Sequence, residues 1–383
     1  MRILFISTSP TSDDRRAWSG TVYQAFKGLE RAGFEVDYLS AMRDYKQTFR
    51  DKLICTYWLR VPGKFGKQTR MDESFYSVGI FRHTLNSFDY SRYDVIFVPT
   101  HIAIVNALPK NIRAKIVHLV DATVDSLFGY YTEFSNLWFH NYWEAHILGK
   151  RAFRRSEMII ASSEWCRQNA IKQYGINPEK IKVIEFGANI DMKDIPAISR
   201  QYECTKPLRI YWSGVNWKRK GGNVALDCCK ELISRGYKIE FHITGMRQLS
   251  QEIYELSWVH NHGFLDKNNP DEYRQLIDIM SKQDLFLFPS RAECSSIALC
   301  EANAFALPCF VYDTGGTANY VENNTNGVML PLSATGKDFA DMIDNSIRNG
   351  RLAEMSVAAR KKYEIDLNWK RWSDKIKHIL ENI

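Results

Sequence analysis

Two glutamates, Glu293 and Glu301, are the side chains whose type and spacing most clearly suggest chemistry. Residues 284–289 before them form a short apolar run that predicts a buried parallel strand, so Glu293 lies in the loop at its carboxyl end. Ser295 or Ser296 can cap the following helix, which places Glu301 about one and a half turns into it, roughly 8 Å along its axis. Ligands of open α/β sheets bind at that edge. Carboxylates so far apart cannot act on one bond, but they suit two hydroxyl-bearing parts of one long ligand, such as a nucleotide sugar.

A basic loop is the second candidate for chemistry. Lys218, Arg219 and Lys220 follow a predicted strand at 208–213 and precede a pair of glycines and a predicted helix at 223–235. Each cation at the start of a helix opposes the helix dipole by about 0.3–1 kcal/mol, so three in a row favour a bound anion. An ammonium, a guanidinium and the free N–H groups of the helix start would together hold a diphosphate. A solvated basic loop is the alternative.

These motifs resemble those of a known family. The pair Glu293 and Glu301, the strand before it, Pro308 and the run at 313–316 resemble the E-x7-E region of retaining GT-B glycosyltransferases of family 4. The resemblance covers nearly the full chain. It implies that Glu293 contacts the transferred sugar and that Glu301 contacts the ribose of the nucleotide. It also implies the GT-B fold, in which two Rossmann-like domains face a ligand cleft.

The resemblance assigns the basic loop to the diphosphate, where cations replace the metal that other glycosyltransferases use. Lys220 matches best, and Arg219 is expected to substitute for a second basic residue, because Val215 stands at that residue's usual position. The implied reaction is retaining and needs no metal: the departing diphosphate accepts the acceptor's proton while Lys220 and Arg219 stabilise its charge. No cofactor is expected besides the donor, and a UDP- or GDP-sugar is the expected donor.

Two positions in the first half match the family less directly. Gly20 lies between the first predicted strand and helix, and resembles the small-residue loop that packs on the diphosphate and acceptor; a plain glycine turn is the alternative. Asp121 follows a predicted strand at 115–120, where many members carry a histidine that contacts the reacting centre. A subgroup carries Asp-Ala-Thr there, as this chain does. His118 and His101 are more typical of core histidines than of a site.

Six further residues match positions where the family uses its backbone: Gly263, Phe264, Leu265, Ser295, Ser296 and Ile297. The first three are expected to hydrogen-bond the base, and main-chain contacts do not encode which base. The last three begin the helix whose N–H groups are expected to reach the sugar and phosphate, although most members have Phe-Gly after the first glutamate. His260 and His262 lie two apart on a predicted strand without a third ligand, so no metal site is predicted.

Apolar runs alternate with helical patterns along the chain, which predicts α/β domains with parallel sheets. The expected strands are residues 2–7, 35–40, 94–99, 115–120, 158–162, 182–185, 208–213, 238–244, 258–264, 284–289 and 308–312. Residues 1–195 are expected to form an acceptor-binding domain and residues 205–366 a nucleotide-sugar-binding domain, with a linker at 192–207. The family resemblance implies that residues 367–383 form a closing helix that returns to the first domain.

The net charge of +7 has a local origin. Between Arg43 and Arg70 lie eight Lys and Arg residues against Asp44 and Asp51, interleaved with five aromatic residues. This segment could contact an anionic membrane surface or a phosphorylated acceptor, or it could be a solvated face. Because no recognition motif accompanies the charge, nucleic acid is not an expected partner. Eight further aromatic residues in 128–143 suit either an acceptor surface that stacks on sugar rings or an aromatic core.

Composition bounds the remaining choices. A chain of 383 residues with 45% hydrophobic residues can form two domains. No run approaches the length of a membrane-spanning helix, and the first nine residues resemble a strand, so a cytoplasmic protein is expected, with peripheral contact at the inner membrane face as an extension. The eight cysteines lack metal-ligand spacing and fit a reducing compartment. The expected acceptor is a glycan or lipid-linked glycan of cell-surface polysaccharide synthesis. Rival functions are a non-catalytic nucleotide-sugar-binding partner, a GT-B epimerase and an inverting transferase.

Overall fold

The computed structural model describes residues 1–43, 45–197, 202–203 and 205–383. Contacts within the chain divide it into two compact units. Unit 1 contains Met1–Ile184 and Ser373–Ile383, and unit 2 contains Glu185–Trp372. The break after Ile184 precedes the predicted linker at 192–207, of which residues 198–201 and 204 lie outside the described part of the chain.

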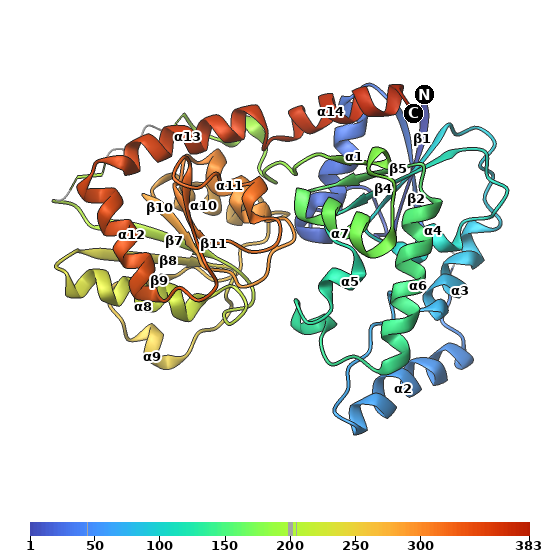
Figure 1. The fold of residues 1–383 in the computed structure, drawn as a ribbon, viewed down its shortest axis with the longest axis horizontal. Helices are drawn as coiled ribbons and strands as arrows, with labels where there is room; N and C mark the ends of the chain where they lie inside the picture. Colours follow the sequence, from blue (N-terminus) through green and yellow to red (C-terminus); the bar gives the residue numbers. More distant parts are fainter. Residues whose placement is uncertain (44, 198–201, 204) are drawn as a thin grey trace. The chain divides into compact units, whose positions relative to one another are not determined.

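Unit 1 is built around a six-stranded sheet in the order β2-β1-β3-β4-β5-β6, and its described pairings are parallel. Its strands are β1 (Arg2–Ser7), β2 (Glu35–Ser40), β3 (Val95–Pro99), β4 (Lys115–Val120), β5 (Met158–Ala161) and β6 (Ile181–Val183). Its helices are α1 (Thr21–Arg31), α2 (Phe49–Lys64), α3 (Phe75–Leu85), α4 (Ile102–Ala107), α5 (Val124–Leu127), α6 (Phe139–Arg155) and α7 (Glu164–Tyr174) (Figure 1). Helix α14 (Trp369–Glu381) contains the second boundary, between Trp372 and Ser373.

Unit 2 repeats this plan with a second parallel sheet, in the order β12-β11-β10-β7-β8-β9. Its strands are β7 (Leu208–Ser213), β8 (Ile239–Thr244), β9 (Val259–Asn261), β10 (Leu285–Phe288), β11 (Cys309–Tyr312) and β12 (Gly327–Leu330). Its helices are α8 (Gly222–Ser234), α9 (Gln251–Tyr254), α10 (Pro270–Ser281), α11 (Ile297–Ala304), α12 (Gly336–Arg348) and α13 (Arg351–Ile365).

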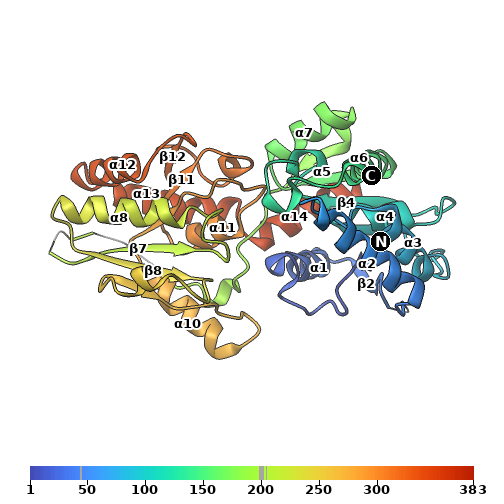
Figure 2. The same cartoon turned by 90° about the horizontal axis from the view of Figure 1, so that it is seen from below.

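Strand β10 shows why the central strands are continuous apolar runs rather than alternating ones. All four of its residues are buried. Leu285 and Leu287 pack with α8 and α12, whereas Phe286 and Phe288 pack with α10 and α11. Figure 2 shows α8 and α10 on opposite sides of this sheet. Helices therefore cover both faces, which leaves no room for a polar side on a central strand.

The structure confirms the predicted α/β class with parallel sheets. Several predicted strand ends are wrong by one to three residues, because a strand extends only as far as the neighbouring strand with which it forms hydrogen bonds. The run predicted at 182–185 is β6 (Ile181–Val183), which pairs with three residues of β5. The run predicted at 258–264 shortens to β9, because the chain turns at Gly263, whose φ is +75°. The helix predicted at 223–235 begins one residue earlier and ends one earlier.

His118 on β4 is a core residue, as its place within the strand suggested. Its side chain is fully buried, its Nε2 lies 3.3 Å from the carbonyl oxygen of Thr100, and its ring packs edge-on against Phe153. Burial lowers its pKa from 6.5 to about 4, because the charged imidazolium would lose its hydration.

We expect this histidine to make the fold sensitive to acid. Below pH 6.5 the unfolded chain binds a proton that the folded chain excludes until about pH 4, so stability falls as the pH falls through that window. The loss from His118 should reach about 3 kcal/mol. Urea midpoints of wild type and His118→Gln, measured between pH 7 and 4, should converge on acidification. The exposed His83→Gln on α3 is the control, and a wild-type slope in His118→Gln would contradict the assignment.

None of the described helices is both long and apolar enough to cross a bilayer. Seven cysteines lie in the described part, six of them buried, and all are free thiols. Cys204 lies outside the described residues.

Candidate functional site

The order of the strands in unit 2 locates a ligand-binding edge. β7 pairs with β8 on one side and with β10 on the other, so the chain winds in opposite directions from these two neighbours. Open α/β sheets bind ligands at the carboxyl ends of their strands where the winding reverses in this way. The loops at these ends, residues 214–221 after β7 and 289–296 after β10, are the two that the sequence singled out for their charged residues.

A buried ion pair joins the two loops. The Nζ of Lys220 lies 2.5 Å from Oε1 of Glu293, and the two side chains are only 14% and 5% exposed. Ser290 donates its hydroxyl to the same carboxylate oxygen at 2.6 Å. The sequence predicted both residues separately for the diphosphate and the sugar, and the structure brings them into direct contact.

Lys220 sits in a site that is poor in water. Its Nζ lies 4.7 Å from the centre of the Phe288 ring. Burial lowers the pKa of Lys220 below its ordinary value, and the Glu293 carboxylate opposes that change. A cation held in such surroundings attracts a second anion more strongly than one in bulk water does, because the local dielectric constant is low. Lys220 is therefore prepared to receive an anionic group.

The predicted partner Arg219 lies beside this pair. Its Nη1 donates to the carbonyl oxygen of Ala292 at 3.0 Å and lies 3.7 Å from Oε1 of Glu293. Its own carbonyl oxygen accepts the backbone N–H of Arg291 at 2.9 Å. These contacts place a second cation next to Lys220 and fasten one loop to the other.

A glycine makes this fastening possible. Gly221 has a φ of +70°, and a Cβ atom there would lie 1.9 Å from the carbonyl oxygen of Pro289. Any side chain would push the two loops apart and would also strain a left-handed backbone. The Gly pair after Lys220 is thus explained by the close approach of the loops.

Glu301 lies on α11, 9% exposed, and forms an ion pair with Lys267. Sequence reasoning missed Lys267, which follows the turn at 263–265 and is separated from Glu301 by 34 positions. Its nearness to the predicted base-binding turn was the only available signal. The pair brings Glu301 and the segment after that turn to one place in unit 2.

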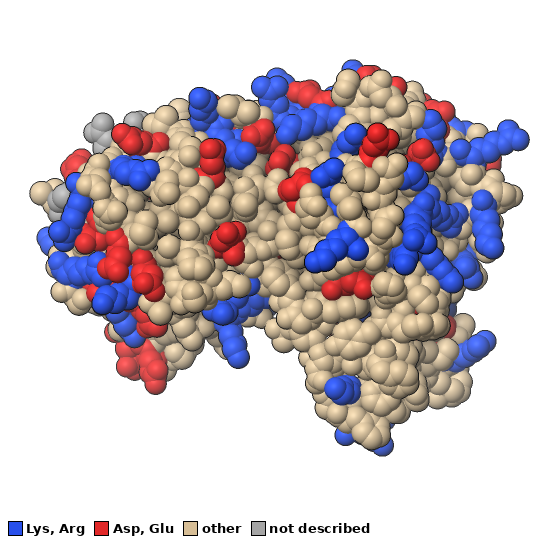
Figure 3. All heavy atoms as spheres, viewed as in Figure 1, with Lys and Arg blue, Asp and Glu red and all other residues tan. Residues whose placement is uncertain are grey.

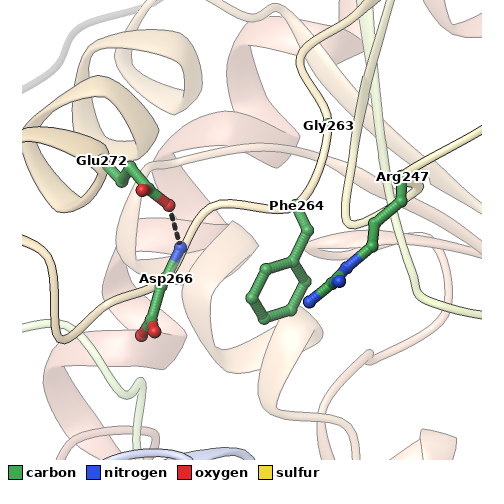
Figure 4. A pocket seen from close by; sticks show the side chains of 5 residues that line it. All are labelled: Arg247, Gly263, Phe264, Asp266 and Glu272. Atoms are coloured by element: carbon green, nitrogen blue, oxygen red, sulfur yellow. Dashed lines mark hydrogen bonds between the residues drawn. The ribbon is translucent and has the colours of Figure 1, made fainter.

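The turn itself borders a cavity of about 420 Å³ lined by Arg247, Gly263, Phe264, Asp266 and Glu272 (Figure 4). Phe264 is 43% exposed, and the Arg247 guanidinium lies 5.3 Å from its ring centre. Glu272 accepts the backbone N–H of Asp266 at 2.6 Å and holds the far side of the turn. Leu265 is half-buried and packs toward the core. Arg247, which follows β8, was not identified from the sequence.

The start of α11 corrects one expectation. Ser296 occupies the N-cap position, but neither Ser296 nor Ser295 caps the helix through its side chain. The Ser296 hydroxyl is buried and lacks a hydrogen-bond partner. Its backbone carbonyl instead accepts the N–H groups of Leu299 and Cys300. The N–H of Ile297, the first residue of α11, has no intrahelical partner by virtue of its position, as at the start of any α-helix.

The two remaining candidates lie in unit 1. Gly20 has a φ of +91° and is the N-cap of α1, preceded by Trp18 and Ser19, whose φ angles are also positive. Such a turn requires glycine at its end and is more constrained than a plain loop. Asp121 directly follows β4 at the carboxyl edge of that sheet. His101 follows β3 at the same edge, and its Nε2 lies 3.0 Å from the Thr8 hydroxyl.

Among the described residues, no group of three or more His, Cys, Asp or Glu side chains has the arrangement of a metal site. His260 and His262 do have a third histidine beside them, because both rings stack on His242 of β8. Burial and the neighbouring rings lower the pKa of His242 to about 4. Ring stacking and a 3.0 Å contact between Nδ1 of His242 and Nε2 of His262 account for the cluster.

Two family models match the chain, and they meet within ten residues of the boundary between the two units. Residues 20–192 match the family described as Glycosyltransferase Family 4, and residues 194–363 match Glycosyl transferases group 1. The amylovoran biosynthesis glycosyltransferase AmsK of Erwinia amylovora is 24% identical over 247 residues, which cover 61% of this chain and 58% of AmsK. The putative colanic acid biosynthesis glycosyltransferase WcaL of Salmonella typhimurium is 23% identical over 61% of this chain and 59% of its own. The aligned parts span less than two thirds of these relatives.

Solved structures share the fold at low identity. The lipopolysaccharide outer core galactosyltransferase WaaB, in its apo form, superposes over the whole of both chains with a TM-score of 0.67 and 14% identity. Sucrose-phosphate synthase of Thermosynechococcus elongatus gives 0.68 and 15%, covering 100% of this chain and 98% of its own. Anabaena HepE in complex with UDP gives 0.62 and 17% over both full chains.

Proposed function

Because this chain belongs to the family 4 glycosyltransferases of the GT-B fold, we propose that it moves a sugar from a nucleotide-diphosphate sugar to a hydroxyl of a glycan or lipid-linked acceptor, with retention at the anomeric carbon. The buried contact of Lys220 with Glu293, beyond the carboxyl ends of the paired strands β7 and β10, carries the proposal. It joins a cation suited to a phosphate and a carboxylate suited to sugar hydroxyls in one water-poor place.

The proposed reaction needs no protein nucleophile. The bond between the anomeric carbon and the diphosphate oxygen breaks, and the acceptor oxygen bonds to the same face of that carbon. The acceptor's proton passes to the departing phosphate oxygen. Lys220 and Arg219 stabilise the charge that develops on the diphosphate, and Glu293 exchanges its contact with Lys220 for the sugar's hydroxyls.

In this scheme two cations do the work that a divalent metal does elsewhere, so a chelator should leave transfer intact. We expect the initial rate of sugar transfer by purified protein to be unchanged by EDTA and by added Mg²⁺ or Mn²⁺. The measurement is product formation after dialysis against the chelator. Activity that disappears on chelation and returns with one metal would contradict the assignment of the diphosphate to Lys220 and Arg219.

Glu301 is proposed to hold the ribose through a charge-assisted hydrogen bond. Glu301→Ala should weaken binding of the free nucleoside diphosphate by about 1–3 kcal/mol, because the hydroxyl loses its charged partner. Isothermal titration with UDP and GDP measures the change. The control is Glu354→Ala, which removes an exposed carboxylate from α13. Equal affinity in Glu301→Ala and Glu354→Ala would contradict the ribose assignment.

The donor base is the first thing to identify. HepE has been solved in complex with UDP and with UDP-glucose, which supports a uridine donor for a chain of the same fold. A thermal-shift panel of UDP, GDP and ADP, followed by their sugars, ranks the candidates, since only a ligand that binds the folded state raises the melting temperature. UDP is expected to give the largest shift.

Product analysis distinguishes the rival functions. Retention predicts the same anomeric configuration in donor and product, whereas an inverting transferase changes it and an epimerase forms product without an acceptor. A non-catalytic binding partner would bind the donor without slow hydrolysis or transfer. AmsK and WcaL are named for amylovoran and colanic acid biosynthesis, which supports a growing surface polysaccharide as the acceptor.

A further inference from the structure

Helix α2 exposes an apolar stripe. Phe49, Leu53 and Tyr57 recur every four residues and are 76%, 56% and 50% exposed. Residues at this spacing lie on one face of a helix. The opposite side of the helix is anchored to unit 1, because Trp58 is buried and its carbonyl oxygen accepts the Thr69 hydroxyl at 2.9 Å. The stripe is thus a fixed surface and not part of a core.

Further exposed aromatic side chains adjoin the helix. Phe65, just after α2, is 67% exposed and its ring lies 5.5 Å from that of Trp138. Trp138 in turn contacts Phe139, which begins α6 and is 76% exposed. Trp143, one turn further along α6, is 60% exposed. The aromatic surface therefore continues from the end of α2 onto the start of α6.

The charges on this surface have one sign. The exposed face of α2 carries Arg50, Lys52, Arg60 and Lys64. The one carboxylate of the helix, Asp51, is taken up by hydrogen bonds: it accepts the backbone N–H of Thr48 at 2.7 Å and the hydroxyl of Tyr76 at 2.9 Å. Figure 3 shows the lobe that carries α2 mainly in tan with separate blue groups. The exposed face of α2 thus combines apolar side chains with cations and, among its described residues, carries no fully exposed carboxylate. Such a face is complementary in charge and polarity to a surface that is both apolar and anionic.

We propose that this face of α2, with Phe65, Phe139 and Trp143, docks on the headgroup region of an anionic lipid bilayer. The three stripe residues enter the acyl boundary, the aromatic rings lie at the headgroup level, and the four cations contact lipid phosphates. Lys and Arg suit this geometry because their long stems reach out from an apolar base. The surface lies in unit 1 and is independent of the donor chemistry in unit 2.

The test is co-sedimentation of the full chain with vesicles of phosphatidylcholine, alone or mixed with phosphatidylglycerol. We expect binding to the anionic vesicles that weakens at high salt. Replacing the stripe in F49S/L53S/Y57S should lower the partition coefficient at least about tenfold. Replacing the cations in R50Q/K52Q/R60Q/K64Q should lower it by about fivefold for each cation.

Matched controls come from unit 2. V357S/I365S/Y254S removes three comparably exposed apolar side chains, and K193Q/K230Q/R274Q/K282Q removes four exposed cations. Both controls should bind vesicles like wild type, and all variants should hydrolyse the soluble donor at the wild-type rate, which separates this proposal from the transfer reaction. Equal binding to neutral vesicles, wild-type binding by the stripe variant, or self-association of the wild type that the stripe variant abolishes would each overturn it.

Discussion

Lys220→Met is expected to lower kcat by roughly 100- to 1,000-fold, the cost of removing one preorganised group that stabilises charge in a transition state. Methionine retains the part of the stem that lies beside Gly214, so the loop should keep its place while the ammonium over the Phe288 ring is lost. The measurement is the steady-state rate of transfer at saturating donor, with the melting temperature as a check on folding.

The adjacent Lys218 is the control for this change. It is exposed, belongs to the same basic loop and differs from Lys220 in having no buried carboxylate partner in the described structure. Lys218→Met should retain most of the rate, while Lys220→Arg should recover part of it by restoring a cation. Equal rates in Lys218→Met and Lys220→Met would show that the loop supplies only diffuse positive charge.

The second large effect is expected from Glu293→Ala, in stability as well as in rate. Removing one member of a buried ion pair leaves the other charge uncompensated, which costs about 3 kcal/mol and corresponds to roughly 6–12 °C for a unit of this size. Turnover should fall further than the affinity for free nucleoside diphosphate, because Glu293 is proposed to contact the sugar. Thermal melting and titration with the diphosphate measure the two effects separately.

The double variant Lys220→Met/Glu293→Ala tests the origin of the lost stability. If the unpaired ammonium causes it, removing Lys220 as well should recover much of the melting temperature without recovering turnover. A double variant that melts lower than Glu293→Ala alone would mean that cavity formation near Ser290, not the buried charge, dominates.

The sequence predicted much of this architecture because its signals are local. The run at 284–289 and the glutamate after it predict a strand that ends in a loop. All eleven predicted strands exist within three residues of their expected ends, and β12 is the described strand that was not predicted. The prediction that a serine side chain caps α11 was wrong, because such a cap depends on the orientation of one side chain. Ser296 has φ −103° and ψ 105°, and its hydroxyl lies in the protein interior.

Local sequence patterns could not predict which distant segments of the chain contact each other. Lys220 and Glu293 are 73 positions apart, and they meet only because β7 and β10 are neighbours, an order that no local pattern encodes. Arg247 and Phe264 likewise follow the paired strands β8 and β9. Lys267 reaches Glu301 although β9 and β10 are not neighbours in the sheet. Each of these missed residues lies in a loop whose partner is set by the fold of the whole sheet.

The close approach of Gly221 to Pro289 limits how donor preference could be engineered in this chain. The two loops share a close backbone contact and the hydrogen bond from the N–H of Arg291 to the carbonyl oxygen of Arg219. Neither loop can therefore be replaced by that of a relative without changing the other. If residues 289–296 were replaced by those of a relative with another sugar preference, they would fit poorly against residues 214–222 unless that segment was replaced as well. Libraries that vary both segments together, with Gly221 kept constant, should therefore yield folded variants far more often than libraries that vary either alone.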